Sequence, residues 1–285
     1  MINEIIYLCN AAGNEAWKRI FGKLCLCLGV VGILLLTGCS EQATTEDHTE
    51  GQAAESVADV SADDNSDEGK SSGLAYETAR DAEINFAALK AENPDIFAWI
   101  YIPDTGIDYP VLQSEEADDY YESHNVYGEV SEEGAVYTEL ANLKNMCDFN
   151  TVLHGKTTAD GETGLFADLY NFADPDFFEN HETAYLYLDG NLLTYEIFAA
   201  YERDNTSLIR TYDFTYISGC QKFLDDMYGT RTMVMNIREG WDNVSPYHFL
   251  VTLTTQKGGN PDKQFVVIGA LVNDAAGTID RIVLE

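Results

Sequence analysis

Short runs of apolar and polar positions in strand-like alternation fill the chain from about residue 97 onward. Eight of these runs are rich in β-branched and aromatic residues and are separated by turn residues, which is typical of β-strands. They are FAWIYI (97–102), DYPVL (108–112), GAVYTE (134–139), NTVLH (150–154), TAYLYL (183–188), LLTYEIFAAYE (192–202), HFLVTLTT (248–255) and QFVVIGALV (264–272). The sequence shows no internal repeat and no alternation of strands with long helices. The pattern therefore predicts a mainly β, closed or nearly closed barrel.

Helical spacing of apolar residues occurs beside this strand pattern. Ile84, Phe86 and Leu89 share one helix face, and Asn93-Pro94 ends that helix. Three further helical segments interrupt the strands, at DDYYES (118–123), FADLYNF (166–172) and YISGCQKFLDDMY (216–228). We therefore expect an eight-stranded barrel with an N-terminal helix and short inserted helices, formed by residues 78–285.

The N-terminal segment has the features of an export signal. Lys18, Arg19 and Lys23 precede an apolar run from Leu24 to Leu36, which is too short for a comfortable membrane span and suits a secretory signal. The run ends in LTGC (36–39), which resembles the lipobox of bacterial lipoprotein signal peptides. That resemblance implies cleavage before Cys39 and a lipid on its thiol, with residues 1–39 as the signal peptide. The alternative is an uncleaved signal anchor.

An acidic segment separates this signal from the predicted barrel. Residues 41–68 contain ten acidic residues and no Lys or Arg, among small and polar residues. Such a segment has too few apolar residues to form a core, and its negative charges repel one another. We therefore expect residues 40–77 to be a disordered, extended tether.

The net charge of the whole chain limits the classes of partner that it can bind. The formal net charge is −33, from 49 acidic and 16 basic residues. Nucleic acid and anionic membrane surfaces are therefore unsuitable partners, whereas cationic peptides, amines or Ca²⁺ are compatible. A solvated acidic surface is the simplest interpretation. No zinc-ligand spacing and no EF-hand loop occur, so we expect no metal and no cofactor.

Cysteine use indicates no redox motif in the body of the chain. The six cysteines stand at positions 7, 25, 27, 39, 147 and 220. Only the last two lie in the predicted barrel, and they are too far apart to form a CxxC motif. Cys147 and Cys220 are compatible with a disulfide outside the cell or with two buried free thiols. We expect the free thiols.

The order of segments in the predicted barrel resembles that of class B sortases. The similarity runs through ENPDIFAWIYIPDTGIDYPVLQ (92–113), DDYYESHNVYGE (118–129), GAVYTE, NTVLHGKTTADGETGLFADLYNF (150–172) and FFENHETAYLY (177–187), and includes a helix before the penultimate strand. It covers roughly residues 83–273. Sortases are extracellular cysteine transpeptidases that cleave a sorting signal and join the product to a cell-wall amine. The resemblance thus implies a sortase barrel and a peptide-binding cleft.

The same resemblance assigns three catalytic positions, and each holds another residue in this chain. The family's Cys ends a T-L-x-T-C strand, where TLTTQ (252–256) has Gln256. The family's His ends a Y-G-H motif, where this chain has Lys156, and the family's Arg opens the last strand, where it has Gln264. A glutamine amide is not a nucleophile, and it lacks the charged fork of arginine. A lysine, with an ordinary pKa of about 10.4, is poorly suited to proton transfer near neutral pH. We expect no intact catalytic residue.

Several roles remain open for the residues of this degenerate cleft, which we define as His154, Lys156, Thr255, Gln256 and Gln264. Lys156 is expected to pair with a carboxylate of the domain or to bind a ligand carboxylate. A Thr255–His154 pair would be a displaced nucleophile and base. However, Thr255 alternates with Gln256 along the strand and is expected to point into the barrel. His154 then serves as a structural residue or lines the cleft. Lys263 is adjacent to Gln264. It would replace the positive charge of the family's arginine only if its side chain lay on the same face of the strand as that of Gln264.

Together these features predict a catalytically degenerate, lipid-anchored, class B sortase-like protein at the outer face of the bacterial cytoplasmic membrane. It would bind a peptide, a cell-wall component or an envelope protein without cleaving it. One alternative is an active sortase-type transpeptidase or peptidase that uses displaced residues. Another is a structural partner in the assembly of surface proteins.

Overall fold

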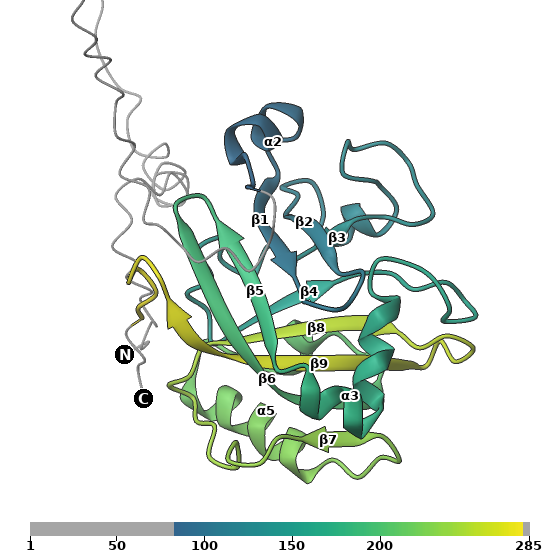
Figure 1. Ribbon diagram of the computed structural model, residues 1–285, viewed down its shortest axis with the longest axis vertical. Coiled ribbons are helices and arrows are strands. Elements are labelled where there is room, and N and C mark those ends of the chain that lie inside the picture. The colour runs from purple at the N-terminus through teal and green to yellow at the C-terminus, as the bar shows by residue number, and fades with distance from the viewer. Residues whose placement is uncertain (1–82, 282–285) are drawn as a thin grey trace, which may run out of the picture. The chain divides into compact units, whose positions relative to one another are not determined.

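The computed structural model describes residues 83–281, and its central element is a closed β-barrel (Figure 1). The strands are β1 (Ile96–Tyr101), β2 (Asp108–Leu112), β3 (Val136–Tyr137), β4 (Asn150–His154), β5 (Thr183–Leu188), β6 (Asn191–Asp204), β7 (Met235–Ile237), β8 (Leu250–Gln256) and β9 (Lys263–Asp274). Their order is β5-β1-β2-β3-β4-β8-β9-β6-β7, and β5 also pairs with β6, which closes a ring of eight strands. The predicted eight-stranded barrel is therefore confirmed.

The ninth strand, β7, was not expected from the sequence. It follows β5 along the same edge of β6, where Ala199, Ala200 and Tyr201 pair with Ile237, Asn236 and Met235. It has three residues, all of them partly buried, so it lacks the alternating run that marks the other strands.

Side-chain alternation on the strands separates two apolar clusters. Val251 and Leu253 of β8 point into the barrel core, whereas Leu250 belongs to a second cluster outside the barrel. The neighbouring strand β9 alternates in the same way, with Val267 inside and Val266 outside. These outward residues need a cover, because exposed apolar surface is unfavourable in water.

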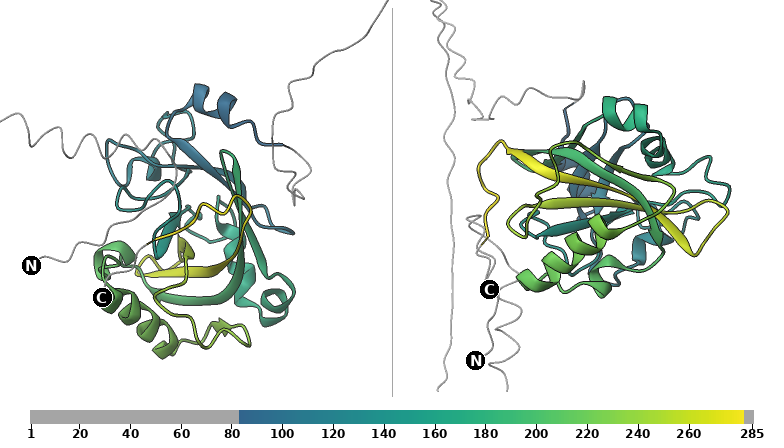
Figure 2. Two further views of the ribbon diagram at one scale, coloured as in Figure 1. Left: turned by 90° about the vertical axis from the view of Figure 1, so that its left-hand side faces the viewer. Right: turned by 90° about the horizontal axis from the view of Figure 1, so that it is seen from below.

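Helix α5 (Ile217–Gly229) supplies that cover. Figures 1 and 2 show it against the outside of the barrel, and its Phe223, Leu224 and Met227 belong to the same outer cluster as Leu250 and Val266. The expected helix at 216–228 is thus confirmed.

The other helices are short. Helix α2 (Phe86–Glu92) begins at the Asn85 side chain, which accepts a hydrogen bond from the Ala88 N–H at 3.0 Å, and it ends at Asn93. The 3-10 helices η1 (Tyr120–Glu122) and η2 (Ala167–Ala173) lie in the two predicted segments. Helices α3 (Pro175–Asn180) and α4 (Leu208–Thr211) were not predicted, since so few residues show no helical periodicity.

The predicted signal peptide, the predicted lipid attachment site Cys39 and the whole predicted tether (40–77) lie outside the described residues. Within residues 83–281, no helix is long and apolar enough to cross a membrane. The two cysteines of this part differ. Cys220 is a buried free thiol, as expected, whereas Cys147 is disulfide-bonded, so the expectation of a free thiol is wrong there. Since Cys220 is free, the two do not pair with each other.

Candidate functional site

The three positions at which catalytic residues were expected lie at one end of the barrel. Strand β4 runs parallel to β8, with His154 opposite Thr254, and the Gly155 N–H extends this pairing to the Thr254 carbonyl at 3.2 Å. Lys156 follows directly. Gln256 at the end of β8 is the register partner of Gln264 at the start of β9. The parallel and antiparallel pairings together bring these segments to the same edge.

Gln256 stands where the resemblance places a nucleophile, and its side chain is exposed. Its Nε2 donates to the Pro261 carbonyl at 3.1 Å, and its own carbonyl accepts from the Tyr170 hydroxyl at 2.9 Å. The residue is therefore held by the loop that joins β8 to β9 and by Tyr170 of η2. Its amide offers hydrogen bonds to a ligand but no route to a covalent intermediate.

That loop is itself fixed against the loop that follows β4. A side chain on Gly258 would overlap the backbone of Gly161, which has a positive φ of 81°. The Gly259 N–H donates to the Ala159 carbonyl at 2.5 Å. Gly258 and Gly161 are thus needed for the close approach of the two loops. This approach holds together the segments that follow β4 and β8.

Gln264 is buried, with 6% of its surface exposed, and every group of its amide is used. Its Oε1 accepts from the Thr254 hydroxyl at 2.6 Å, and its Nε2 donates to the carbonyls of Asp204 and Thr206 at 3.2 and 3.0 Å. Gln264 therefore fastens the segment after β6 to the barrel. Lys263 does not replace the family's arginine, because its Nζ binds the Asp204 carboxylate at 2.6 Å.

Lys156 has a different partner from the one that we expected. Its Nζ donates to the backbone carbonyl of Glu132 at 3.1 Å, and no carboxylate of residues 83–281 lies within 4.0 Å of it. Glu132 belongs to the loop between η1 and β3, and it offers its backbone carbonyl rather than its carboxylate. The expected ion pair between Lys156 and a carboxylate of the domain is therefore not formed. A carbonyl satisfies one donor and neutralises no charge, which leaves the ammonium suited to an anionic group.

Thr255 does not form the displaced catalytic pair. It is 2% exposed, and its hydroxyl lies 2.6 Å from that of Thr157. The neighbouring β8 residue Leu253 points into the barrel core, and Thr255 has the same parity along the strand. It is therefore turned away from His154, which has the parity of Val152 in the outer cluster.

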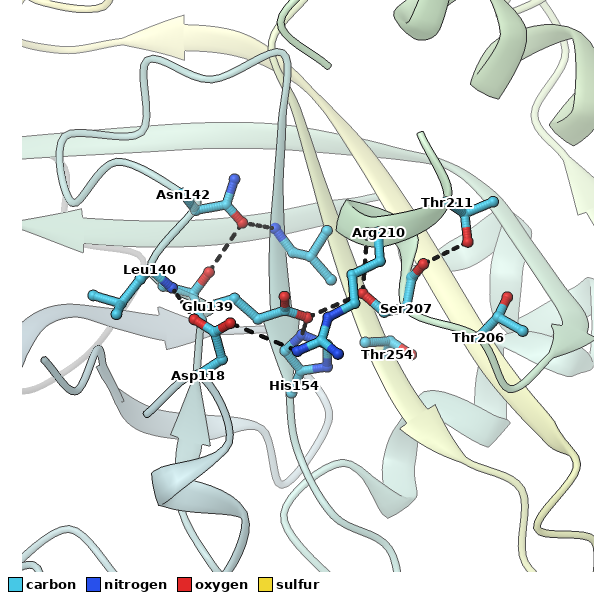
Figure 3. A network of polar contacts seen from close by, with 12 residues as sticks. Asp118, Glu139, Leu140, Asn142, His154, Thr206, Ser207, Arg210, Thr211 and Thr254 are labelled. Carbon is cyan, nitrogen blue, oxygen red and sulfur yellow. Dashed lines mark hydrogen bonds and ion pairs between the residues drawn. The ribbon is translucent and has the colours of Figure 1, made fainter. Parts of the chain in front are cut away.

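His154 contacts an acidic residue that the sequence did not single out. Its ring stacks on Tyr137 with centroids 5.0 Å apart, and its Nε2 lies 3.4 Å from Oε1 of Glu139. The same oxygen accepts from the Ser207 hydroxyl at 3.3 Å (Figure 3). The contact with His154 holds the pKa of Glu139 below its ordinary value, against the opposing effect of burial. Glu139 therefore stays ionised at neutral pH.

This contact is part of a polar network that joins three segments over the strand ends. Asp118 lies 3.8 Å from the Arg210 guanidinium and accepts from the Leu140 N–H at 3.0 Å (Figure 3). Ser207 begins helix α4 and accepts from the Arg210 N–H at 3.3 Å. The segment before η1, the end of β3 and α4 are thus linked by their own side chains.

The network is not a nucleophilic triad. In a triad the histidine lies between the hydroxyl and the carboxylate, so that it takes the proton of the attacking group. Here Ser207 and His154 both contact Glu139. Among residues 83–281 no histidine contacts the Ser207 hydroxyl, whose acceptor is the Glu139 carboxylate, so the arrangement supports binding or structure rather than a His-activated nucleophile.

Comparisons with known proteins agree with this geometry, although no family model matches the chain. Sortase B of Listeria monocytogenes is 40% identical over 131 residues, which are 45% of this chain and 48% of that protein. The alignment thus spans about half of that relative's length. Sortase B of Staphylococcus aureus is 30% identical over 195 residues, 66% of this chain and 74% of that protein.

Solved structures of class B sortases are also similar to this chain. Sortase B of Clostridium perfringens has a TM-score of 0.57 at 27% identity, and the match covers 66% of this chain and all of that one. A class B sortase of Streptococcus pyogenes, involved in pilus biogenesis, has a TM-score of 0.57 at 26% identity, with 66% and 98% covered. A substrate complex of S. aureus sortase B has a TM-score of 0.55 at 25% identity, with 66% and 84% covered. The chain described here belongs to the class B sortase family.

Proposed function

We propose that this protein is a catalytically degenerate class B sortase, which binds a peptide or a cell-wall component at the cell surface without cleaving it. One observation carries the proposal. The positions of the family's nucleophile, proton carrier and arginine hold Gln256, Lys156 and Gln264, while the barrel that positions them is intact.

The surroundings of these three residues support binding over chemistry. Gln256 is exposed and offers an amide donor and acceptor, which suit the backbone of an extended peptide. Lys156 offers an ammonium group with no carboxylate partner among the described residues. Gln264, by contrast, is committed to the fold. A ligand would therefore contact Gln256 and Lys156, and Gln264 would support the wall behind them.

The predicted location agrees with such a role. The lipobox-like LTGC (36–39) would place a lipid on Cys39, and the acidic segment would hold the domain away from the membrane. The substrate complex of the S. aureus relative supports a ligand that resembles a sortase substrate, for which we propose a peptide. A partner in the envelope that presents such a peptide would meet the domain there.

A pull-down from the native cell envelope tests the proposal. The lipid-anchored wild type is compared with Gln256→Trp, which would obstruct the cleft, and with Gln221→Trp, the same change at an exposed position of α5. We expect wild type and Gln221→Trp to retain a peptide-bearing component that Gln256→Trp loses. Retention by all three would indicate a role in surface-protein assembly through another face.

A cleavage assay complements the pull-down. Purified protein is incubated with peptides that carry sorting signals, and the products are followed by mass spectrometry. We expect binding without turnover. Turnover that is abolished by Thr255→Ala or His154→Ala would overturn the proposal in favour of an enzyme with displaced residues.

A further inference from the structure

A cavity of about 320 Å³ lies beside the polar network, outside the degenerate cleft. One wall is the loop between β3 and β4, with Asn142 and Asp148, and the floor includes Asn150 of β4. The other wall is the segment that leads from α4 to α5, with Tyr212 and Asp213. The cavity is not lined by any of the three residues at the replaced catalytic positions.

The first wall is fixed by one asparagine. The Asn142 Nδ2 donates to the Asn150 carbonyl at 2.9 Å and to the Asp148 carboxylate at 3.1 Å. Its Oδ1 accepts from the Val152 N–H at 2.9 Å. The loop is therefore held to β4 along its length, and the cavity is a built feature of the fold.

The second wall is fixed against α5. Gly219 lies so close to the Asp213 carbonyl that a side chain at this position would overlap it. The Tyr212 hydroxyl donates to Asp226 of the same helix at 3.0 Å. These contacts hold Tyr212, Asp213 and Phe214 in place, with Phe214 and Tyr212 stacked at a centroid distance of 5.9 Å.

The cavity contains two carboxylates that the described contacts use only in part. Asp148 is 6% exposed, and its Oδ2 accepts from the Leu143 N–H at 2.6 Å and from Asn142. Within residues 83–281 its Oδ1 accepts no hydrogen bond. Asp213 is exposed and accepts from the Thr215 N–H at 3.0 Å. Burial raises the pKa of Asp148 to about 6, although its hydrogen bonds and the charge of Arg281 oppose this shift, and a second cation beside it would further favour the ionised form.

A buried donor in the same place lacks a partner. Asn150 is fully buried, and its Oδ1 accepts from the Thr252 hydroxyl at 2.8 Å. Its Nδ2 has no hydrogen-bond partner among the described residues. Buried donors are rarely left unpaired in folded proteins, so this one indicates an acceptor outside the described residues, a role that a ligand would fill.

We propose that the cavity is a second binding site, which receives a lysine or arginine side chain of a peptide ligand. Asp148 and Asp213 would hold the cationic group, the faces of Tyr212 and Phe214 would cover its aliphatic stem, and a ligand carbonyl would reach Asn150. Arg210 also lines the cavity, but its guanidinium is directed to Asp118. The formal net charge of −33 would steer a cationic peptide toward the protein.

The test is a titration of the ¹⁵N-labelled full chain with N-acetyl-lysine-N-methylamide, followed by NMR. N-acetyl-norleucine-N-methylamide, which lacks the ammonium, is the matched probe. We expect saturable shifts of the Asn150 side-chain amide and of the Leu143 N–H with the lysine probe alone. Asp213→Asn should weaken binding by about tenfold, which is typical of one charged hydrogen bond. Asp225→Asn, the same change on an exposed part of α5, should leave it unchanged.

Three results would each overturn the inference. They are equal binding of the norleucine probe, an equal loss with Asp225→Asn, and no saturable shift up to the solubility limit of the lysine probe. The variant Gln256→Trp separates this site from the proposed function. It should bind the lysine probe as the wild type does, whether or not the cleft itself captures an envelope component.

Discussion

Gln256 and Gln264 face each other across the β8–β9 pair, yet one amide is exposed and the other is buried with all its groups hydrogen-bonded. Two identical side chains at paired positions of β8 and β9 thus have different tasks. The exposed amide makes one hydrogen bond, to the Pro261 carbonyl, and remains accessible to a ligand, whereas the buried amide holds the segment after β6 to the barrel. This difference gives the first prediction.

Gln264→Ala should destabilise the protein far more than Gln256→Ala. The first change leaves the buried Thr254 hydroxyl and two partly buried backbone carbonyls without their partner, at a cost of about 2 kcal/mol or more. The second removes one exposed hydrogen bond and should cost less than about 0.5 kcal/mol. Urea unfolding of both variants measures the difference. Equal losses would show that the contacts of Gln264 are not essential.

Gln256→Cys should not restore peptide cleavage. A cysteine needs a nearby proton carrier, and Lys156 is bound to the Glu132 carbonyl while His154 contacts Glu139. We expect turnover of a sorting-signal peptide to stay at the uncatalysed level in a mass-spectrometric assay. The triple variant Lys156→His, Gln256→Cys and Gln264→Arg is the positive comparison. Activity of the single variant would show that another residue carries the proton.

Asp148→Asn should stabilise the protein at neutral pH. The pKa of Asp148 is raised from 3.8 to about 6 by burial, so the folded state binds this proton more tightly than the unfolded state. The free energy of unfolding therefore falls as the pH rises through 6, and the full cost is present above it. The variant should gain up to about 3 kcal/mol at pH 7.5 and nothing near pH 3.5. Urea unfolding at both pH values checks this, with Asp225→Asn as the exposed control.

Glu139→Gln should show the opposite dependence on pH. The pKa of Glu139 is lowered from its ordinary 4.5, mainly by His154, so its ionised form stabilises the folded state. That contribution is present above the unfolded pKa and is lost as the pH falls through the folded one. The variant should be less stable than the wild type at pH 7, and the gap should close as the pH falls through the lowered pKa of Glu139. Glu162→Gln, an exposed change of the same kind, should show no gap at either pH.

Gly219→Ala should destabilise the protein, whereas Gly229→Ala should not. Both glycines belong to α5, but a methyl group on Gly219 would overlap the Asp213 carbonyl, and one on Gly229 meets no atom within 4 Å. We expect a loss of about 2 kcal/mol or more for the first and a gain of up to about 1 kcal/mol for the second, since alanine favours helix. Thermal unfolding followed by circular dichroism distinguishes them. The loss of lysine-probe binding by Gly219→Ala would further link this contact to the cavity.

The barrel could be predicted from the sequence because its strands alternate between an apolar core and an outer surface. Strand β7 and helix α4 could not be predicted, because segments of three and four residues are too short to show a periodic pattern of apolar residues. Their positions depend on neighbours, with β7 pairing to β6 and α4 beginning at Ser207.

The candidate site could be predicted in part. Gln256 and Gln264 keep recognisable strand motifs around them, so their positions follow from the resemblance to the family. Glu139 and Ser207 belong to no such motif, and 68 residues separate them. Their contact arises only when the barrel brings the end of β3 beside α4. The partner of Lys156 was predicted wrongly, because sequence spacing does not show which loop carbonyl lies near an ammonium group.

The closed ring of strands also limits how another protein can join this one. Among the described strands, β7 alone has a single strand neighbour, and it has three residues. A partner that adds a β-strand to a sheet needs a longer free edge, and so does edge-to-edge aggregation. Recognition by this domain must therefore depend on its side chains and loops. Many copies crowded on one surface would have little opportunity to associate through their backbones.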